Sequence, residues 1–420
     1  MRLRPLLLAG LLLSICSLAH AEEHGGGHDA KAPSEPAHGA PAKAEADKKS
    51  GPPLPVVEMP GPHSELTLTV RKMQRLQDLI AIGNRDAQLQ QQKVLADVGG
   101  LIRDLGSTIC MTRENRRALI IATLNGGTPA WVRACLADKT LSEQDRHLLR
   151  GAVAYSIGRT QNALEEFQTI DPLTLDPSLA AQVALVRASL TLPVDRALGL
   201  RFLDIARLLQ PGGLVEEAAL RQETATLGTS GDTQKFALLS RQYIERFSKS
   251  VFSDNFIQGF VRGVIELGLA ADDEHFAKLR EVVDLLTPEA AASTYLLIAR
   301  RGLLDGTYGA TRRATAAALT LVSPNSSEAS RANLYRFAAA VTGTEGLQMQ
   351  KKLQAMDANA FQPRDQKLRD AALKIADGIR KPPLANTTKG VEATAAQPET
   401  PIVKKAFQTL ALAQTMVEAP

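Results

Sequence analysis

The chain has 420 residues, a formal net charge of +4, 44% hydrophobic residues and only 4% aromatic residues. This length is enough for two or three domains, and the small positive excess does not support binding to nucleic acid. Sheets depend on β-branched and aromatic residues, whereas Ala, Leu, Arg, Gln and Glu favour helices. The composition therefore predicts an all-α protein without a nucleic-acid partner.

The first 21 residues have the three parts of a secretory signal peptide. Arg2 and Arg4 give a positive start, and Leu6–Leu18 is an apolar stretch shorter than the about 20 residues that a spanning helix needs. The small residues of Ala19-His20-Ala21 then form a cleavage site. We expect cleavage before Glu22, a periplasmic product and no membrane span in the mature chain. A retained membrane anchor is the alternative.

The three cysteines bear on lipidation and on cross-linking. Cys16 leaves a lipoprotein open as an alternative, although Ile15 stands where a lipobox has a small residue. After cleavage before Glu22, the remaining cysteines are Cys110 and Cys135. Two such residues tend to pair in an oxidising compartment, and closing a loop of about 25 residues stabilises by roughly 3 kcal/mol. We predict this disulfide; two buried free thiols are the alternative.

Two segments lack the apolar periodicity of a folded core. Residues 22–64 form a leader rich in Pro, Ala and Gly, which cannot bury enough surface to fold. Residues 381–420 are expected to form a flexible tail, in which 402–417 is either a frayed end or a short docking helix. The sequence thus predicts a disordered N-terminal leader and a disordered C-terminal tail.

Apolar residues recur at three- and four-residue steps between these segments, as in amphipathic helices. Residues 65–144 are predicted to form an N-terminal helical region, and residues 145–380 to form helix pairs spaced by about 35 residues. The expected pairs are His147–Gly158 with Gln161–Ile170, Ser178–Leu190 with Arg196–Leu209, Leu214–Leu227 with Thr233–Phe247, Asp254–Leu267 with Glu274–Leu286, Glu289–Leu303 with Gly309–Leu321, and Glu328–Val341 with Glu345–Met356, before a last helix, Arg364–Arg380.

Repeated helix pairs are typical of α-solenoids, in which each pair packs only against its neighbours. In the first pair, Gly151, Ala163 and Phe167 stand where a tetratricopeptide repeat (TPR) has small and aromatic residues, but later pairs drift from that pattern. The predicted fold is therefore a degenerate, TPR-like α-solenoid. An irregular helical bundle is the alternative.

The sequence contains no pattern typical of catalysis. His147 and His275 lie far apart, and neither has zinc-type spacing to the other or to a cysteine. The acidic run at Asp272 is predicted to start a helix, because carboxylates in a first turn complement the helix dipole. We found none of the common hydrolase, phosphate-binding or dinucleotide-binding motifs. We therefore predict no catalytic, cofactor-binding or metal-binding residue.

Four segments between residues 66 and 345 read VRKMQRLQDLIAIGNRDAQ, RENRRALIIATLNGGTPAWVRACL, SGDTQKFALLSRQYIERFSKSVFSDNFIQGFVRGVIELG and TPEAAASTYLLIARRGLLDGTYGATRRATAAAL. These segments resemble the MotC family of alphaproteobacterial flagellar motility proteins. The resemblance implies an exported, non-enzymatic protein that is needed for motor rotation. It also implies binding to the periplasmic part of the stator protein MotB, which the protein would stabilise or position.

The most specific part of this resemblance, residues 231–321, is where we expect the partner-binding surface. Exposed arginines are natural interface anchors and can meet acidic groups of a partner. The candidates are Arg241, Arg262, Arg300, Arg312 and Arg313. A general TPR-like scaffold of the cell envelope and a divergent peptidoglycan-acting enzyme are the alternative functions.

Overall fold

The computed structural model describes residues 64–380, which form α-helices and short 3-10 turns and contain no strand. The prediction of an all-α fold is confirmed. No helix within these residues is long and apolar enough to cross a membrane. The predicted signal peptide, leader and tail lie outside the described residues. The chain divides into two compact units, residues 1–332 and 333–420.

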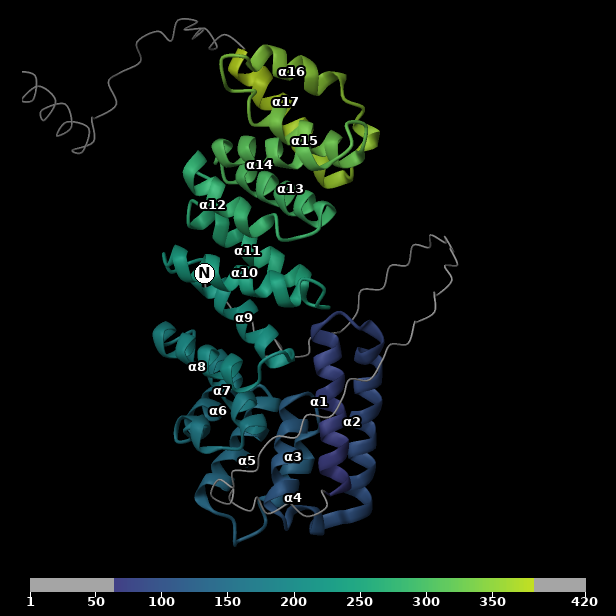
Figure 1. The fold of residues 1–420 in the computed structure, drawn as a ribbon, viewed down its shortest axis with the longest axis vertical. Coiled ribbons are helices and arrows are strands. Elements are labelled where there is room, and N and C mark those ends of the chain that lie inside the picture. Colours follow the sequence, from purple (N-terminus) through teal and green to yellow (C-terminus); the bar gives the residue numbers. More distant parts are fainter. Residues whose placement is uncertain (1–63, 381–420) are drawn as a thin grey trace, which may run out of the picture. The chain divides into compact units, whose positions relative to one another are not determined.

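The first unit begins with a helical hairpin of α1 (Glu65–Ala81) and α2 (Arg85–Leu105), seen in Figure 1. The Ser64 hydroxyl caps α1, and the Asn84 side-chain oxygen accepts a hydrogen bond from the N–H of Ala87 over 3.0 Å. Because Asn84 is the cap, α2 begins at Arg85. The apolar stripe of α1 is buried at Leu66, Val70, Met73, Leu76 and Ile80.

A disulfide links the next two elements, the 3-10 turn η1 (Gly106–Cys110) and α4 (Pro129–Cys135). Cys110 and Cys135 are both buried, and their Cα atoms lie 5.2 Å apart. Helix α3 (Arg113–Leu124) lies between them in the sequence and contacts both elements. The disulfide therefore joins two elements that pack around α3.

Ten further helices follow in the first unit. Helices α8, α9 and α10 begin and end at the predicted residues, whereas α5 begins four residues early because the Ser142 hydroxyl accepts a hydrogen bond from Asp145 N–H. The bounds are α5 Glu143–Ser156, α6 Thr160–Gln168, α7 Pro177–Thr191, α8 Arg196–Leu209, α9 Leu214–Leu227, α10 Thr233–Phe247, α11 Ser253–Glu266, α12 Asp273–Val283, α13 Pro288–Leu304 and α14 Tyr308–Leu321. A 3-10 turn, η2 (Pro172–Thr174), precedes α7.

The pair α5–α6 packs as its TPR-like residues predict. Ala163 and Phe167 of α6 are fully buried. A Cβ atom placed on Gly151 of α5 would lie 2.9 Å from ring atoms of Phe167. Glycine is therefore required here because the aromatic ring occupies the space of a side chain. Arrangement of all the pairs in a regular superhelix stays a prediction.

Side-chain size sets the spacing of the later helices. Helices α13 and α14 approach closely, since Gly302 faces Thr311, whose hydroxyl donates to the carbonyl of Ala299 over 3.1 Å. By contrast, stacked aromatic rings fill the space between α10 and α11: the ring centroids of Tyr243 and Phe256 lie 3.7 Å apart. Helix α11 packs mainly against α9 and α13, and α12 against α10, rather than against each other.

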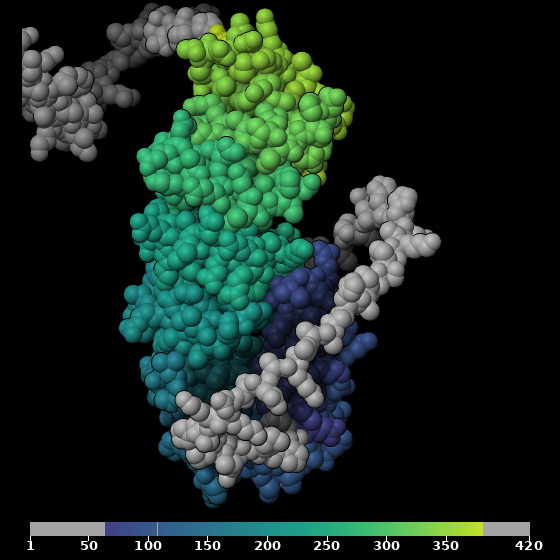
Figure 2. Space-filling view, in the orientation of Figure 1, coloured from purple at the N-terminus to yellow at the C-terminus, as the bar shows by residue number. Residues whose placement is uncertain are grey.

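The end of the α1–α2 hairpin packs against the middle of the first unit. Helix α1 contacts α9, and the Val251 N–H donates a hydrogen bond to the carbonyl of Ile80, with 3.4 Å between nitrogen and oxygen. Gly83 lies so close to the carbonyl of Lys249 that a Cβ atom would approach it within 2.3 Å. In the space-filling view, the purple hairpin meets the teal segment of the chain (Figure 2). Segments about 170 residues apart thus share one interface.

The second unit is described from residue 333 to residue 380. It contains the end of α15 (Ser327–Ala338), α16 (Gly346–Ala355), the 3-10 turn η3 (Ala358–Ala360) and α17 (Pro363–Arg380). The buried Tyr335 hydroxyl donates to the Asp365 carboxylate over 2.7 Å. This bond ties α15 to the first turn of α17.

We predict that removal of the disulfide destabilises the protein. Replacing both Cys110 and Cys135 by alanine should lower the free energy of unfolding by about 3 kcal/mol, because the loop between them is no longer closed in the unfolded chain. Urea unfolding of the exported protein measures this loss, and reduced wild-type protein is the control. Alkylation of free thiols in unfolded, non-reduced protein would contradict the bridge.

We predict that Gly151→Ala is destabilising by about 1–3 kcal/mol, since the added methyl group must displace the buried ring of Phe167. The matched control is Gly100→Ala in α2, where the nearest atom lies 3.9 Å away. That variant should be neutral, or stabilising by up to about 1 kcal/mol. Thermal unfolding of both variants tests the packing, and equal melting temperatures would show that it is wrong.

Candidate partner-binding surface

Helix α9 carries three buried glutamates in the interior of the first unit. Glu216, Glu217 and Glu223 are each at most 1% exposed. The helix contacts α1, α7, α8, α10 and α11, so little of its surface faces solvent. Buried carboxylates are strongly destabilising unless they are paired, and each of the three has cationic partners on α8, α9 or α10.

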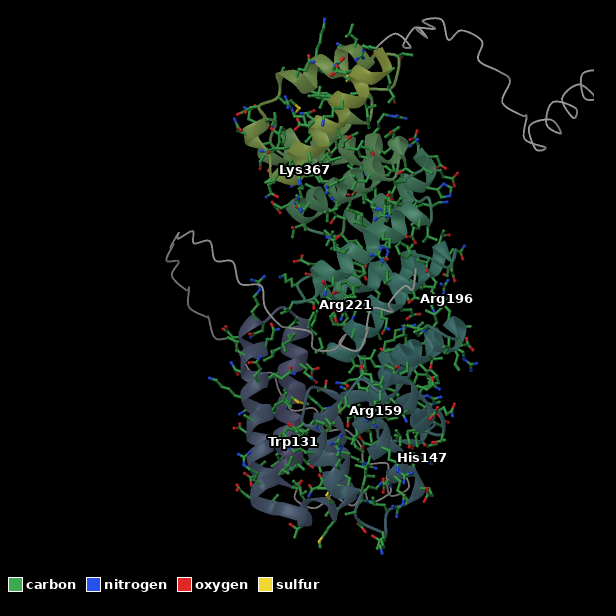
Figure 3. All side chains as sticks on the ribbon, turned by 180° about the vertical axis from the view of Figure 1, so that it is seen from behind. Trp131, His147, Arg159, Arg196, Arg221 and Lys367 are labelled. Carbon is green, nitrogen blue, oxygen red and sulfur yellow. A yellow bond between two sulfur atoms is a disulfide. The ribbon has the colours of Figure 1, made fainter. Side chains whose placement is uncertain are left out.

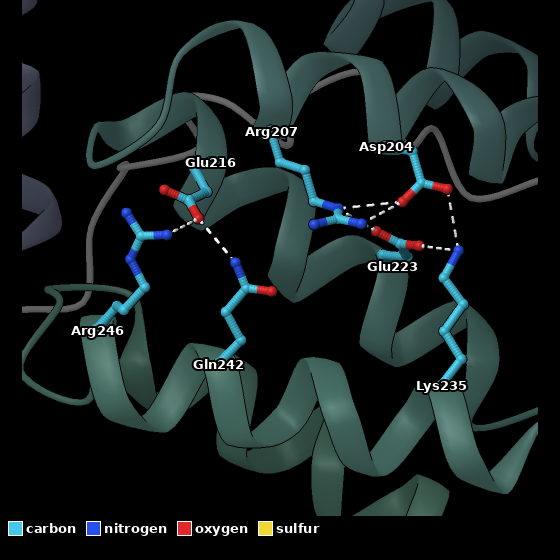
Figure 4. A network of polar contacts seen from close by, with 7 residues as sticks. All are labelled: Asp204, Arg207, Glu216, Glu223, Lys235, Gln242 and Arg246. Atoms are coloured by element: carbon cyan, nitrogen blue, oxygen red, sulfur yellow. Dashed lines mark hydrogen bonds and ion pairs between the residues drawn. The ribbon is translucent and has the colours of Figure 1, made fainter.

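Glu223 joins a four-residue cluster between α8, α9 and α10 (Figure 4). Its carboxylate lies 2.6 Å from Lys235 Nζ and 3.4 Å from Arg207 Nε. Asp204 completes the cluster, at 2.6 Å from Arg207 and 3.0 Å from Lys235. Burial raises the pKa of Glu223, and the nearby Lys235 offsets only part of that rise.

The net pKa shift of Asp204 is opposite to that of Glu223, although the same two cations lower the pKa of both carboxyl groups. Burial pushes the pKa of Asp204 upward, but hydrogen bonds from Arg207 and Lys235 outweigh it, so the pKa lies below the ordinary 3.8. Likewise, burial lowers the pKa of Lys235, but hydrogen bonds to Glu223 and Asp204 raise it above the ordinary value. The charged forms of Asp204 and Lys235 are thus favoured by folding.

The other two glutamates bind the opposite end of α10 and the turn before α9. Glu216 accepts hydrogen bonds from Gln242 at 3.0 Å and from Arg246 and the Gly212 N–H at 2.5 Å each. Glu217 pairs with Arg221 of its own helix at 3.1 Å.

Glu217 also accepts a hydrogen bond from the Tyr243 hydroxyl over 2.7 Å. Burial and the Glu217 charge raise the pKa of Tyr243. The contacts of Glu216, Glu217 and Glu223 thus join α9 to α8 and α10.

Sequence reasoning missed this network. A signal was present, because α9 has apolar residues all around it and therefore no polar face for its glutamates. The glutamates of α9 could therefore have been predicted to lie in the interior of the first unit.

The structure places the five candidate arginines in different environments. Arg313 lies 2.5 Å from Asp273 and donates to the carbonyl of Ala271 over 2.8 Å, so it ties α14 to the start of α12. Arg241 lies 3.8 Å from the carboxylate of Glu281 on α12. Both are thus engaged within the chain.

The other three candidates differ in exposure. Arg300 is half-buried on α13. Arg262 and Arg312 are exposed and have no ion-pair partner among residues 64–380. Of these two, Arg312 lines a cavity, so it is the arginine best placed to meet a partner.

Arg312 lines a cavity of about 490 Å³ at one end of helices α11–α14. The α11–α12 turn and the α13–α14 turn form its walls, with Gly268 and Gly306 in the left-handed region at φ of +67° and +76°. We call it the α11–α14 pocket. Its lining residues are Val264, Ile265, Gly268, Ala270, Ala271, Gly306, Thr307, Tyr308, Gly309, Ala310 and Arg312.

The two histidines and the tryptophan have structural surroundings. His147 lies 2.7 Å from Glu166, and His275 lies 2.8 Å from Asp272, which caps α12 as the sequence predicts. The Trp131 ring packs against Gly99 and lies well away from His147 (Figure 3). No cluster of three His, Cys, Asp or Glu residues suited to a metal ion is present in the part of the chain that the structure describes.

Two comparisons with known proteins agree on the family. The family model described as "Chemotaxis protein MotC" matches residues 17–419. A relative named "Chemotaxis protein MotC" from Rhizobium meliloti (strain 1021) is 26% identical over 321 residues, which cover 76% of this chain and 73% of the relative. No solved structure matches the chain.

We predict that Asp204→Asn lowers the free energy of unfolding at neutral pH by about 1–3 kcal/mol, because Arg207 and Lys235 lose hydrogen bonds to a charged acceptor. The pKa of Asp204 is lower in the folded than in the unfolded protein, so its stabilising contribution is present above about pH 4 and is lost as the pH falls below that. The difference between wild type and variant should therefore shrink in acid.

Urea unfolding at several pH values measures this difference. The exposed Glu266 provides the control, because Glu266→Gln should change stability by less than about 0.5 kcal/mol. A stability difference for Asp204→Asn that does not depend on pH would contradict the assigned ion pairs.

Proposed function

Because the chain belongs to the MotC family, we propose that it is a non-enzymatic periplasmic protein needed for flagellar motility. We further propose that it binds the periplasmic part of the stator protein MotB and stabilises or positions it. The single observation that carries the proposal is the family match over residues 17–419.

The signal-peptide features of residues 1–21 support export to the periplasm. An exported protein meets a stator only where the stator protrudes from the membrane, which is why the periplasmic part of MotB is the proposed partner. Helix α14 supports a binding role, because it presents the exposed Arg312 beside a cavity.

We expect a strain that lacks this chain to keep its flagella but to swim poorly or not at all. Expression of the wild-type chain should restore swimming, and the mature protein recovered from the periplasm should begin at Glu22. Crosslinking in living cells should join it to MotB. Normal swimming of the deletion strain would overturn the motility role. Impaired swimming without a MotB crosslink would overturn only the proposed partner.

Zymography on cell-wall material separates this proposal from peptidoglycan-acting enzymes. We expect no cleared band from the purified protein, with lysozyme as the positive control. Cleavage of the wall by the wild-type chain would contradict a purely non-enzymatic role.

A further inference from the structure

We propose that the α11–α14 pocket is the docking site for an acidic segment of the protein partner, with Arg312 as its anchor. This inference rests on the proposed function, since it assigns a site and a chemistry to the binding of MotB. The partner segment would place an apolar side chain in the pocket and a neighbouring Asp or Glu carboxylate on Arg312.

The pocket has the size and the lining for a side chain of a protein. Its volume is about 490 Å³, and Val264, Ile265 and Ala310 supply apolar walls. Gly268 and Gly306 turn the chain at positive φ without adding side chains of their own. Such a concave, mainly apolar site with few polar groups suits an apolar side chain, whose orientation a polar group then fixes.

The charges around the pocket favour an acidic partner. Asp273 is bound to Arg313 at 2.5 Å, and Asp305 to Arg301 at 2.6 Å. Glu274 lies 2.9 Å from Lys278.

Asp272 is engaged in the same way, because it caps α12 and contacts His275. Asp272, Asp273, Glu274 and Asp305 thus have partners, whereas Arg312 has none among residues 64–380. One unneutralised guanidinium therefore faces the pocket.

Arginine is well suited to hold a carboxylate in one orientation. Its guanidinium can donate two parallel hydrogen bonds to the two carboxylate oxygens, which a lysine ammonium cannot do. Arg312 is exposed in the free protein, so its charge is available to an approaching partner. A docked apolar group would exclude water from one side of the ion pair and strengthen it.

The test measures the affinity of the full mature chain for the purified periplasmic part of MotB. Arg312→Glu should weaken binding about tenfold or more, because it replaces attraction by repulsion. Arg312→Lys should weaken it less, since the charge remains and the paired hydrogen bonds are lost. The matched control is Arg262→Glu, which reverses an exposed arginine outside the pocket lining and should have a small effect.

A second variant tests the cavity without a change of charge. Ala271 is exposed and lines the pocket, so Ala271→Phe should fill it from the rim and weaken binding about tenfold, with unchanged helical content by circular dichroism. Arg313 is left unaltered, because its reversal would break the ion pair with Asp273.

The outcomes separate the inference from the function on which it rests. Wild-type affinity in both Arg312→Glu and Ala271→Phe would overturn the pocket and leave MotB as the partner. Equal losses in Arg312→Glu and Arg262→Glu, with no loss in Ala271→Phe, would also overturn it, since only net charge would then matter. No binding of the wild-type chain would overturn both proposals.

Discussion

The arrangement of the first unit depends on the ion pairs of three buried carboxylates on α9, a helix that other helices cover on nearly all sides. Helix α9 contacts five other helices, and Glu216, Glu217 and Glu223 have almost no exposure to solvent. Removing one partner of a buried ion pair typically costs 3–5 kcal/mol, because the remaining charge is left without compensation. The cations of α8 and α10 must therefore reach α9 in one arrangement. Lys235 and Arg246 pair with glutamates near opposite ends of α9, so α10 is held to α9 at two separate points.

A second constraint is the small number of aromatic side chains, which makes helix spacing depend on where they lie. Gly302 and Thr311 allow α13 and α14 to pack closely, whereas the stacked rings of Tyr243 and Phe256 fill a wider space between α10 and α11. In the same region, glycines and short side chains form the turns that bound the α11–α14 pocket. The cavity thus lies where two glycine-containing turns meet.

Local signals in the sequence predict the helices well. Side-chain caps such as Asn84 and Asp272, and prolines in first turns, act within three or four residues, so they can be read along the chain. The contact between Gly151 and Phe167 could also be predicted, because both residues belong to one helix pair and stand at positions typical of a TPR. The network around α9 could not be predicted in this way, because Lys235 and Asp204 are 31 residues apart. Arg313 and Asp273 are 40 residues apart, so a pattern of three- and four-residue steps cannot predict their ion pair either.

The arginines show why a binding surface cannot be identified from residue type alone. Arg312 and Arg313 are neighbours in the sequence, yet successive helical residues point about 100° apart, so only one of them reaches Asp273. That pair makes Arg313 part of the contact between α12 and α14. The charge of Arg312 is left for a partner because the nearby carboxylates are already bound. Whether an arginine stabilises the fold or is available for recognition is thus decided by which carboxylates the fold brings within its reach.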